Sequence, residues 1–346
     1  MSVQPNIYLA ALFGYIARFA HRLMRSLDRR FCIAPMLDCT DRHDRYFLRL
    51  FSKRIFLYSE MITTQAILHG DRDYLLGFDP AEHPLAVQLG GSDPQELAEV
   101  ARICADYGYD EINLNVGCPS DRVQSGAFGA CLMARPDRVA DCVQAMKAVV
   151  DIPVTVKHRT GIDEQDSWDE LVNFCRWQIE GGVDALVIHA RKAWLSGLSP
   201  KQNRDIPPLQ YERVYALKQQ FPATEIIING GIKTLDECKT HLQQVDGVML
   251  GREPYANPYL LAQVDREIFG DEGRPPPTRQ QILQRFYPYL QSQLDRGMPL
   301  THVVRHIIGL FHGQPNGRLW RRHLSENAFR KGAGIEVIEQ AAALVQ

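Results

Sequence analysis

Short apolar segments rich in β-branched residues alternate along this chain with longer segments of helical periodicity. A buried parallel strand forms a short, nearly continuous apolar run, whereas an amphipathic helix repeats its apolar positions every three to four residues. Eight such runs occur, and their alternation with helical patterns predicts a parallel sheet. The predicted strands are Phe31–Pro35, Ile55–Tyr58, Leu85–Leu89, Glu111–Asn115, Val154–Lys157, Ala185–His189, Glu225–Ile228 and Gly247–Leu250.

Helical patterns occupy the intervals between these strands, and several begin after Pro or Asp, which are common at helix starts. Eight strand–helix units over roughly 235 residues match the usual size of a (β/α)8 TIM barrel, whereas a doubly wound sheet more often stops at five to seven strands. We therefore expect an α/β fold with a TIM barrel over residues 31–268. The clearest predicted helices are Pro94–Tyr107, Pro136–Val149, Trp168–Glu180, Tyr211–Phe221 and Leu235–Leu242.

The pattern changes after the barrel. The acidic, Pro-rich segment Asp271–Thr278 breaks helix formation and predicts a linker over residues 269–279. No convincing strand follows, so residues 280–346 are expected to form a small all-helical domain. Basic residues outnumber acidic ones from position 302 onward. The predicted helices of this domain are Gln280–Asp295, His302–Phe311 and Gly317–Arg330.

Residues 1–30 are expected to form an N-terminal extension outside the barrel. The longest apolar run, Ile7–Ala17, is far shorter than the ~20 residues that span a bilayer, and positive charge follows it rather than precedes it as in a signal peptide. The arginines behind the run make the segment basic and amphipathic, so surface contact with a membrane or targeting is the alternative to a non-structural extension. Met24 is an alternative first residue of the protein. No stable membrane association is expected.

The composition is typical of a globular protein, with 45% apolar and 23% charged residues. A formal net charge of −2 provides no overall attraction to nucleic acid, so such a partner must bind a local basic patch. The eight cysteines lack CxxC pairs, which suits a reducing cytosol, and a cytoplasmic location is expected. His302 and His306 stand four apart on a predicted helix, but no acidic or thiol partner accompanies them, and no metal site is predicted.

One thiol, Cys118, lies just after a predicted strand in the sequence Asn113-Leu-Asn-Val-Gly-Cys-Pro-Ser120. Gly117 gives the backbone unusual freedom, while Pro119 fixes the next φ and removes an amide donor, so the thiol sits on a tightly specified turn. This placement favours a chemical role. The alternative is a structural cysteine, because cysteine is among the most frequently buried residues.

Other unusual polar residues also fall at strand ends, where barrel enzymes carry their active sites. After strands seven and eight come Asn229-Gly230-Gly231 and Gly251-Arg252, and barrels often bind phosphate with these two loops. An amide, a lysine and a histidine near a phosphate site match the donors and the cation that a flavin requires. Alone, Lys157 could be a solvated cap and His189 a partly buried histidine. The strand-end residues are Met36, Leu37, Gln88, Asn113, Asn115, Cys118, Lys157, Arg159 and His189.

From about Phe31 to the C-terminus the sequence resembles the tRNA-dihydrouridine synthases, most closely those of the A type. The resemblance rests on Ala34-Pro-Met-Leu-Asp38, Tyr58-Ser-Glu-Met61, Gln88-Leu-Gly-Gly91, the Cys118 motif with Gly129-Ala-Cys-Leu132, Val154-Thr-Val-Lys157, Ile188-His-Ala-Arg191 and the two glycine loops. The runs from His189 to Arg204 and from Gly317 to Asn327 are similar to A-type signatures.

The resemblance implies an FMN-bearing barrel that uses NADPH to reduce uridines at positions 20 and 20a of the tRNA D-loop. It implies that Cys118 is the catalytic acid. The residues implied to hold FMN are Pro35, Met36, Leu37, Gln88, Lys157, His189, Asn229, Gly230, Gly231, Gly251 and Arg252. Those implied to contact tRNA are Asn115, Lys201 and Arg204 near the barrel mouth, and Arg318 and Arg321 from the helical domain.

In the implied reaction, hydride adds to carbon 6 of uracil and Cys118 protonates carbon 5 from the opposite face. Two other functions stay open. One is an FMN barrel dehydrogenase that acts on a free pyrimidine, which would share the phosphate site and the proton donor. The other is a tRNA-binding factor without essential catalysis. The basic helical domain argues against the first, and the combination of Cys118, Lys157 and the phosphate loops argues against the second.

Overall fold

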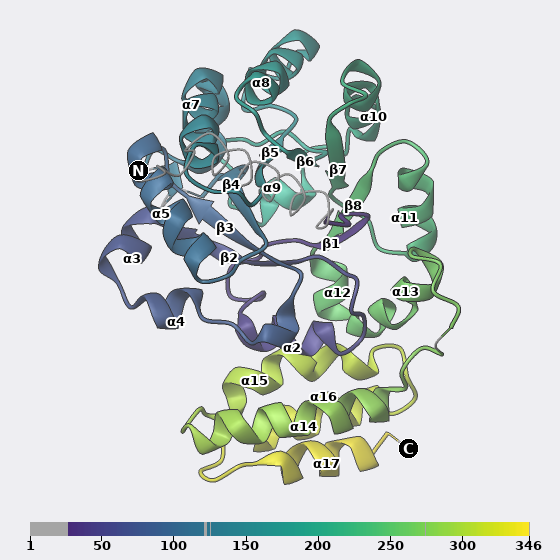
Figure 1. The fold of residues 1–346 in the computed structure, drawn as a ribbon. Coiled ribbons are helices and arrows are strands. Elements are labelled where there is room, and N and C mark those ends of the chain that lie inside the picture. The colour runs from purple at the N-terminus through teal and green to yellow at the C-terminus, as the bar shows by residue number, and fades with distance from the viewer. Residues whose placement is uncertain (1–26, 121–122, 125, 274, 346) are drawn as a thin grey trace, which may run out of the picture.

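The computed structural model describes residues 27–120, 123–124, 126–273 and 275–345 (Figure 1). The expectations about Ile7–Ala17, the arginines up to Arg25 and the alternative start at Met24 fall outside the described residues. Arg29 and Arg30, which the sequence pattern placed in the extension, are described and lie against the barrel.

Eight parallel strands form one sheet in the order β1-β8-β7-β6-β5-β4-β3-β2. The sheet curls into a nearly closed barrel, because Phe56, just before β2, exchanges backbone hydrogen bonds with Phe31 and Ile33 of β1 at 2.9 and 2.8 Å. The TIM-barrel prediction is confirmed. The strands are β1 Phe31–Ile33, β2 Leu57–Thr63, β3 Leu85–Gly90, β4 Glu111–Val116, β5 Val154–Arg159, β6 Ala185–His189, β7 Glu225–Asn229 and β8 Gly247–Leu250.

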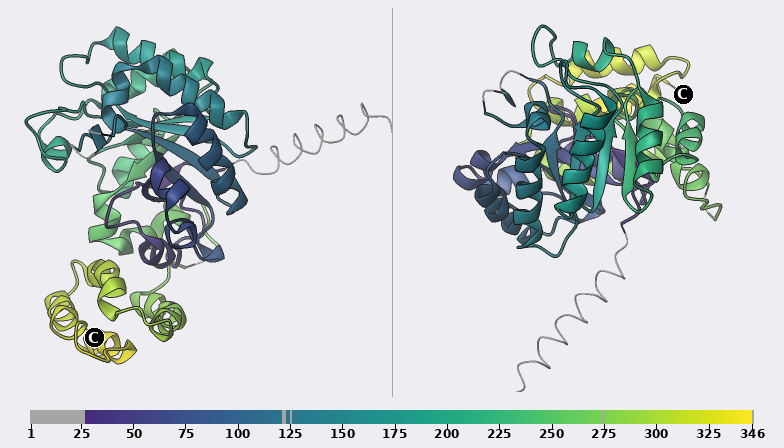
Figure 2. Two further views of the ribbon diagram at one scale, coloured as in Figure 1. Left: turned by 90° about the vertical axis from the view of Figure 1, so that its left-hand side faces the viewer. Right: turned by 90° about the horizontal axis from the view of Figure 1, so that it is seen from above.

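Helices between the strands form the outer ring (Figures 1 and 2). Local sequence explains several of their starts: α5 and α7 begin at Pro94 and Pro136, and Ser167 forms a capping box with Glu170 at α8. The helices of the barrel region are α2 Arg42–Arg49, α3 Thr64–His69, α4 Arg72–Leu76, α5 Pro94–Asp106, α7 Pro136–Lys147, α8 Trp168–Glu180, α9 Gln202–Asp205, α10 Tyr211–Gln220, α11 Leu235–Leu242, α12 Arg252–Ala256 and α13 Val264–Glu267, with 3-10 turns η1 Pro80–Glu82, η2 Gly129–Ala134 and η3 Pro258–Gln263.

The predicted second strand was wrong in position. It was placed at Ile55–Tyr58, but β2 begins at Leu57 and continues through Thr63. Ser59 and Glu60 interrupt the apolar run, which hid the extension from the sequence pattern. The backbone nevertheless continues to pair with β3 after a register shift between Tyr58 and Met61. The polar residues that follow Tyr58 therefore belong to the strand rather than to a loop.

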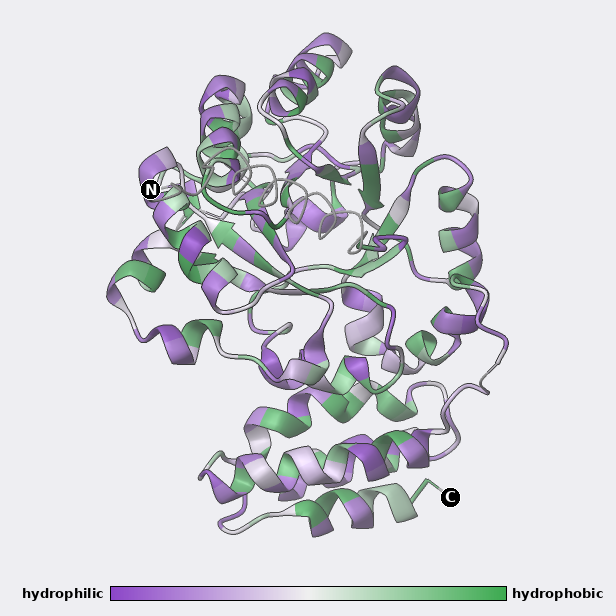
Figure 3. Ribbon diagram, in the orientation of Figure 1, coloured by the Kyte–Doolittle hydropathy of each residue, from purple (hydrophilic) through white to green (hydrophobic). Residues whose placement is uncertain are grey.

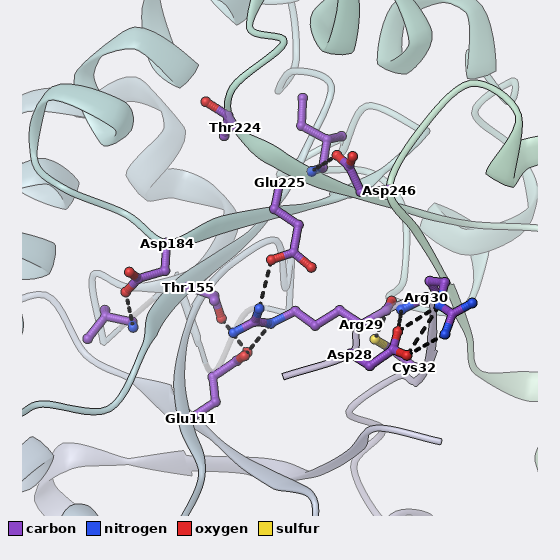
Figure 4. Close-up of polar contacts among 12 residues, drawn as sticks. Asp28, Arg29, Arg30, Cys32, Glu111, Thr155, Asp184, Thr224, Glu225 and Asp246 are labelled. Atoms are coloured by element: carbon purple, nitrogen blue, oxygen red, sulfur yellow. Dashed lines mark hydrogen bonds and ion pairs between the residues drawn. The ribbon is translucent and has the colours of Figure 1, made fainter. Parts of the chain in front are cut away.

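Two apolar layers stabilise the barrel. The larger lies between the strands and the helix ring, and the strands are mostly hydrophobic while the outer helices alternate between hydrophobic and hydrophilic residues (Figure 3). A smaller cluster fills the barrel interior with Cys32, Phe56, Tyr58, Val187 and their neighbours. The buried Arg29 side chain enters this interior and pairs with Glu111 of β4 at 2.6 Å and Glu225 of β7 at 2.7 Å (Figure 4).

A helical region follows the barrel, as predicted, and packs against it through α2 (Figures 1 and 2). Tyr46 of α2 stacks on Tyr289 with ring centroids 3.8 Å apart, and Phe47 meets Phe286 edge-on at 5.2 Å. The last helix of the region had not been assigned from the sequence. Among the described residues, no helix has the length and apolar content needed to cross a bilayer. The elements are α14 Arg279–Asp295, α15 Leu300–Ile307, η4 Ile308–Phe311, α16 Gly317–Asn327 and α17 Ile335–Ala343.

Candidate active site

A cavity of about 1250 Å³ opens at the carboxyl ends of the strands. Typical small-ligand pockets measure roughly 300–1,000 Å³, so this one has room for a cofactor and for part of a second ligand. Parallel strands of a barrel end at one rim, which explains why residues far apart in sequence meet here. The sequence-predicted residues that line it are Pro35, Met36, Leu37, Gln88, Asn115, Cys118, Lys157, His189, Arg204, Asn229, Gly230, Gly231, Gly251 and Arg252.

Three predicted site residues do not line this cavity. Lys201 is exposed just before α9, three residues from the cavity residue Arg204. Arg318 and Arg321 lie on α16 in the helical region, where Arg318 is exposed and Arg321 partly buried. These cations belong to the molecular surface rather than to the cavity wall.

The Cys118 turn is fixed by hydrogen bonds on both sides. The side-chain oxygen of Asn115 accepts from the backbone N–H groups of Gly117 and Cys118 at 3.1 and 3.0 Å. The Cys118 carbonyl accepts from the N–H of Ala130 at 2.9 Å. Gly129 has a φ of +76°, and a Cβ there would lie 2.6 Å from the Cys118 carbonyl oxygen. A glycine is therefore required beside the turn, and the thiol is held at the cavity wall.

Lys157 projects into the cavity from β5 without a carboxylate partner among the described residues. Its Nζ donates to the side-chain oxygen of Asn229 at 3.2 Å, and the Asn229 amide is oriented by donating to the Met249 carbonyl at 2.7 Å. Burial, and secondarily the charge of Arg159, lowers the pKa of Lys157 to about 7. An ammonium in this position favours the binding of an anionic or electron-accepting group.

His189 and the glycine loop after β7 lie in contact. Burial, followed by the charge of Arg159, lowers the pKa of His189 well below its usual value, so the imidazole is neutral. Gly230 has a φ of +118°, and a Cβ there would lie 2.7 Å from the His189 ring; Gly231 has a φ of +72°. Both positions need glycine, and the backbone N–H groups of a glycine loop that lines a cavity suit a phosphate. Arg252 lines the same cavity and pairs with Asp205 at 2.7 Å.

Arg159 connects two parts of the site, a role that the sequence did not reveal. Its side chain is 4% exposed. It donates from Nε to the carbonyl of Gly117 at 2.9 Å, and from Nη1 to the carbonyls of Asn203 at 2.9 Å and Lys192 at 3.2 Å. Arg159 therefore links the Cys118 turn to α9, which carries Arg204 and follows Lys201.

The helical region also contributes to the cavity wall, through Met298, Thr301, His302 and Arg305 among others. These residues were not selected from the sequence. The sequence signal that could have identified them was the spacing of basic residues along one amphipathic helix. The sequence does not show which way that helix faces, because its orientation toward the barrel depends on the packing of α15 on α2. Arg305 in this wall is paired with Asp41 of the same cavity at 2.5 Å.

Comparison with known proteins identifies similar chains along most of the sequence. The family described as dihydrouridine synthase (Dus) matches residues 32–346. A tRNA-dihydrouridine(20/20a) synthase of Shewanella oneidensis is 59% identical over 322 residues, covering 93% of this chain and 96% of its own. The synthase of the same name from Vibrio vulnificus is 60% identical over 317 residues, covering 91% and 97%. That of Escherichia coli O6:H1 is 59% identical over 319 residues, covering 91% and 95%.

A solved structure of lower similarity supports the fold alone. The 2-naphthoyl-CoA reductase complex with 2-naphthoyl-CoA matches with a TM-score of 0.52 and 12% identity, covering 73% of this chain and 51% of the other.

Proposed function

Since this chain belongs to the dihydrouridine synthase family, as the sequence motifs predicted, we propose that it reduces uridine to 5,6-dihydrouridine at positions 20 and 20a of the tRNA D-loop. The observation that carries the proposal is the convergence of the Cys118 thiol, the Lys157 ammonium and the glycine loop after β7 in one cavity. A proton donor, a cation and a phosphate site together fit reduction of a pyrimidine by a phosphorylated flavin.

The residues present fit FMN as the cofactor. Gly230 and Gly231 line the cavity and offer backbone N–H groups to a phosphate, and Lys157 supplies a cation for the flavin ring. When bound, FMN supplies the hydride that adds to uracil carbon 6, with NADPH as the reductant. The proposed holding residues are Pro35, Met36, Leu37, Gln88, Lys157, His189, Asn229, Gly230, Gly231, Gly251 and Arg252.

Cys118 acts as the general acid in this proposal. Hydride addition at carbon 6 leaves an electron pair that is delocalised over carbon 5 and the adjacent carbonyl. The Sγ–H bond breaks, its proton forms the new bond at carbon 5, and the thiolate later regains a proton from water. General acid catalysis of this kind contributes typically 10²–10⁴-fold to a rate. The turn formed by Asn115 and Gly129 holds the thiol where this transfer takes place.

We propose that tRNA is bound by two sets of polar and basic residues. Asn115, Lys201 and Arg204 contact it near the mouth, and residues 280–346 form a tRNA-binding domain that contributes Arg318 and Arg321. Single-stranded loop bases can be unstacked and inserted into a pocket, while arginine and lysine bind the phosphates. The proposal includes action in the cytoplasm, where tRNA and NADPH are available.

The test is to map dihydrouridine in tRNA from a strain that lacks this protein. We expect the modification at positions 20 and 20a to disappear, to return with the wild-type gene, and not to return with Cys118→Ala. The purified protein should be yellow and release FMN. A dehydrogenase of free pyrimidines would reduce uridine without tRNA, and a binding factor would restore function with Cys118→Ala. Either result would overturn the proposal.

A further inference from the structure

An unbroken series of side-chain hydrogen bonds runs through the barrel interior from Arg29 to the Cys118 turn. Strand β4 has the sequence Glu-Ile-Asn-Leu-Asn-Val, so Glu111, Asn113 and Asn115 point to one face of the strand and the apolar residues to the other. Gln88 of β3 and Thr155 of β5 are the register partners of Asn113. These five inward-facing polar residues, which we call the interior relay, are Glu111, Thr155, Asn113, Gln88 and Asn115.

Each neighbour in the interior relay is within hydrogen-bonding distance of the next. Glu111 and the Thr155 hydroxyl are 2.6 Å apart (Figure 4), and Thr155 and the Asn113 amide nitrogen are 2.8 Å apart. The side chains of Asn113 and Gln88, and those of Gln88 and Asn115, are separated by 2.7 Å. All five residues are at most 9% exposed. Water therefore does not replace these bonds, and their directions matter energetically.

Both ends of the interior relay fix those directions. Glu111 also receives bonds from Arg29 at 2.6 Å and from the Tyr58 hydroxyl at 2.8 Å, which is the pattern of an ionised carboxylate that only accepts. Thr155 must then donate to Glu111, since its alternative acceptor, the Ile112 carbonyl, is 3.4 Å away. The oxygen of Thr155 is left to accept from Asn113.

The same reasoning fixes the directions of the hydrogen bonds between the amide side chains. Asn113 donates through its nitrogen to Thr155, so its oxygen accepts from Gln88, and the oxygen of Gln88 accepts from Asn115. At the far end the Gly117 and Cys118 N–H groups can only donate, so the oxygen of Asn115 must face them. The two ends agree. The remaining N–H groups of Gln88 and Asn115, both cavity residues, are then donors available to carbonyl oxygens of a ligand.

We propose that Thr155 is a positioning residue for the reaction, acting through the interior relay on the Cys118 turn and on the donors of Gln88 and Asn115. The inference rests on the proposed function for its catalytic consequence. Without the Thr155 hydroxyl, Asn113 loses its acceptor, and the amides are oriented from the Cys118 end alone. The Asn115 side chain is then held less firmly, and the Cys118 turn that it supports becomes less rigid.

The experiment compares Thr155→Val with Tyr58→Phe and Thr155→Ser. The first two each delete one hydroxyl that donates to the same Glu111 oxygen, but only Thr155 continues to the amides. Thr155→Ser restores the hydroxyl. The readouts are the rate at which iodoacetamide alkylates Cys118 in FMN-free protein, measured by peptide mass spectrometry, and kcat and KM on tRNA.

We expect Thr155→Val to accelerate Cys118 alkylation at least about threefold and to lower kcat about tenfold with little change in KM, because small displacements of catalytic groups are costly. Tyr58→Phe and Thr155→Ser should stay within about twofold of wild type. Equal behaviour of Thr155→Val and Tyr58→Phe, or no rescue by serine, would overturn the inference. If Thr155→Val does not fold, Thr155→Cys replaces it, since a thiol is a weak donor and acceptor. Wild type without synthase activity would refute the proposed function, whereas the alkylation rates would still test the relay.

Discussion

Replacing Lys157 by methionine should stabilise the FMN-free protein, and the gain should depend on pH. The partly buried ammonium of Lys157 has a pKa of about 7, against an ordinary value of 10.5. That difference corresponds to about 5 kcal/mol of preference for the neutral amine in the folded chain. Methionine has similar length and carries no charge, so it removes the penalty while keeping the packing of the side chain.

The direction in which stability changes with pH follows from the number of protons that Lys157 binds in the folded and in the unfolded chain. Below pH 7 Lys157 is protonated in both the folded and the unfolded chain, so the full penalty acts on the wild type. Between pH 7 and 10.5 only the unfolded chain holds this proton, and the wild-type free energy of unfolding rises by about 1.4 kcal/mol per pH unit from this group. Above pH 10.5 the penalty is absent. Lys157→Met should therefore exceed the wild type in stability by up to about 5 kcal/mol at pH 6, and the gap should shrink steadily toward pH 10.

The assay is urea unfolding of FMN-stripped protein at intervals between pH 6 and 9.5. Lys239→Met is the matched control, because Lys239 is exposed and paired with Glu267 at 2.7 Å. It should show no gain at any pH. Wild type and Lys157→Met curves that run parallel across this range, or a variant less stable than wild type at pH 6, would refute the reasoning. With FMN the order should reverse, since the variant lacks the cation proposed to hold the cofactor.

Three further outcomes are expected. Cys118→Ala should retain FMN but reduce uridine about 10²–10⁴-fold more slowly in single-turnover assays, and near-normal turnover would exclude the acid role. Replacing Arg318 and Arg321 together by alanine should weaken tRNA binding in filter assays and lower its salt dependence while sparing NADPH oxidation; unchanged binding would contradict the assignment. Gly129→Ala should destabilise the protein by more than the control Gly182→Ala. Residue 182 has a φ of +87°, so alanine there carries a similar backbone strain of roughly 1–2 kcal/mol, but its Cβ would meet nothing within 4 Å. Equal losses of unfolding free energy in urea would disprove the clash with Cys118.

Much of the fold was predictable because the barrel repeats one local pattern. The apolar runs gave Ala185–His189 and Gly247–Leu250 with their observed bounds. The pattern failed at Ser59 and Glu60 in β2, because both line the cavity and accept hydrogen bonds from the backbone N–H groups of Gln88 and Asp38 instead of packing in an apolar core. Helix α17 was missed because no strong capping signal marks its start at Ile335.

The candidate site was predictable where it depends on strand ends and not where it depends on tertiary packing. Gln88, Lys157 and His189 meet because parallel strands end at one rim. The position of His302 and Arg305 depends on how α15 packs on α2, more than 200 residues away in sequence, and no local pattern carries that information. The link from Arg159 to the carbonyls of two loops is likewise a property of the folded chain.

The Arg29 side chain at the base of the barrel has a consequence for how the chain assembles. It joins Glu111, which belongs to the first four strands, to Glu225, which belongs to the last four. A fragment that ends after β4 would keep the arginine with only one of its carboxylates, and a fragment that begins at β5 would leave Glu225 without its cation. Unpaired charges of this kind are costly in an interior. Separating the two half-barrels would therefore cost Arg29 one of its ion pairs, and joining them again as separate chains would restore it.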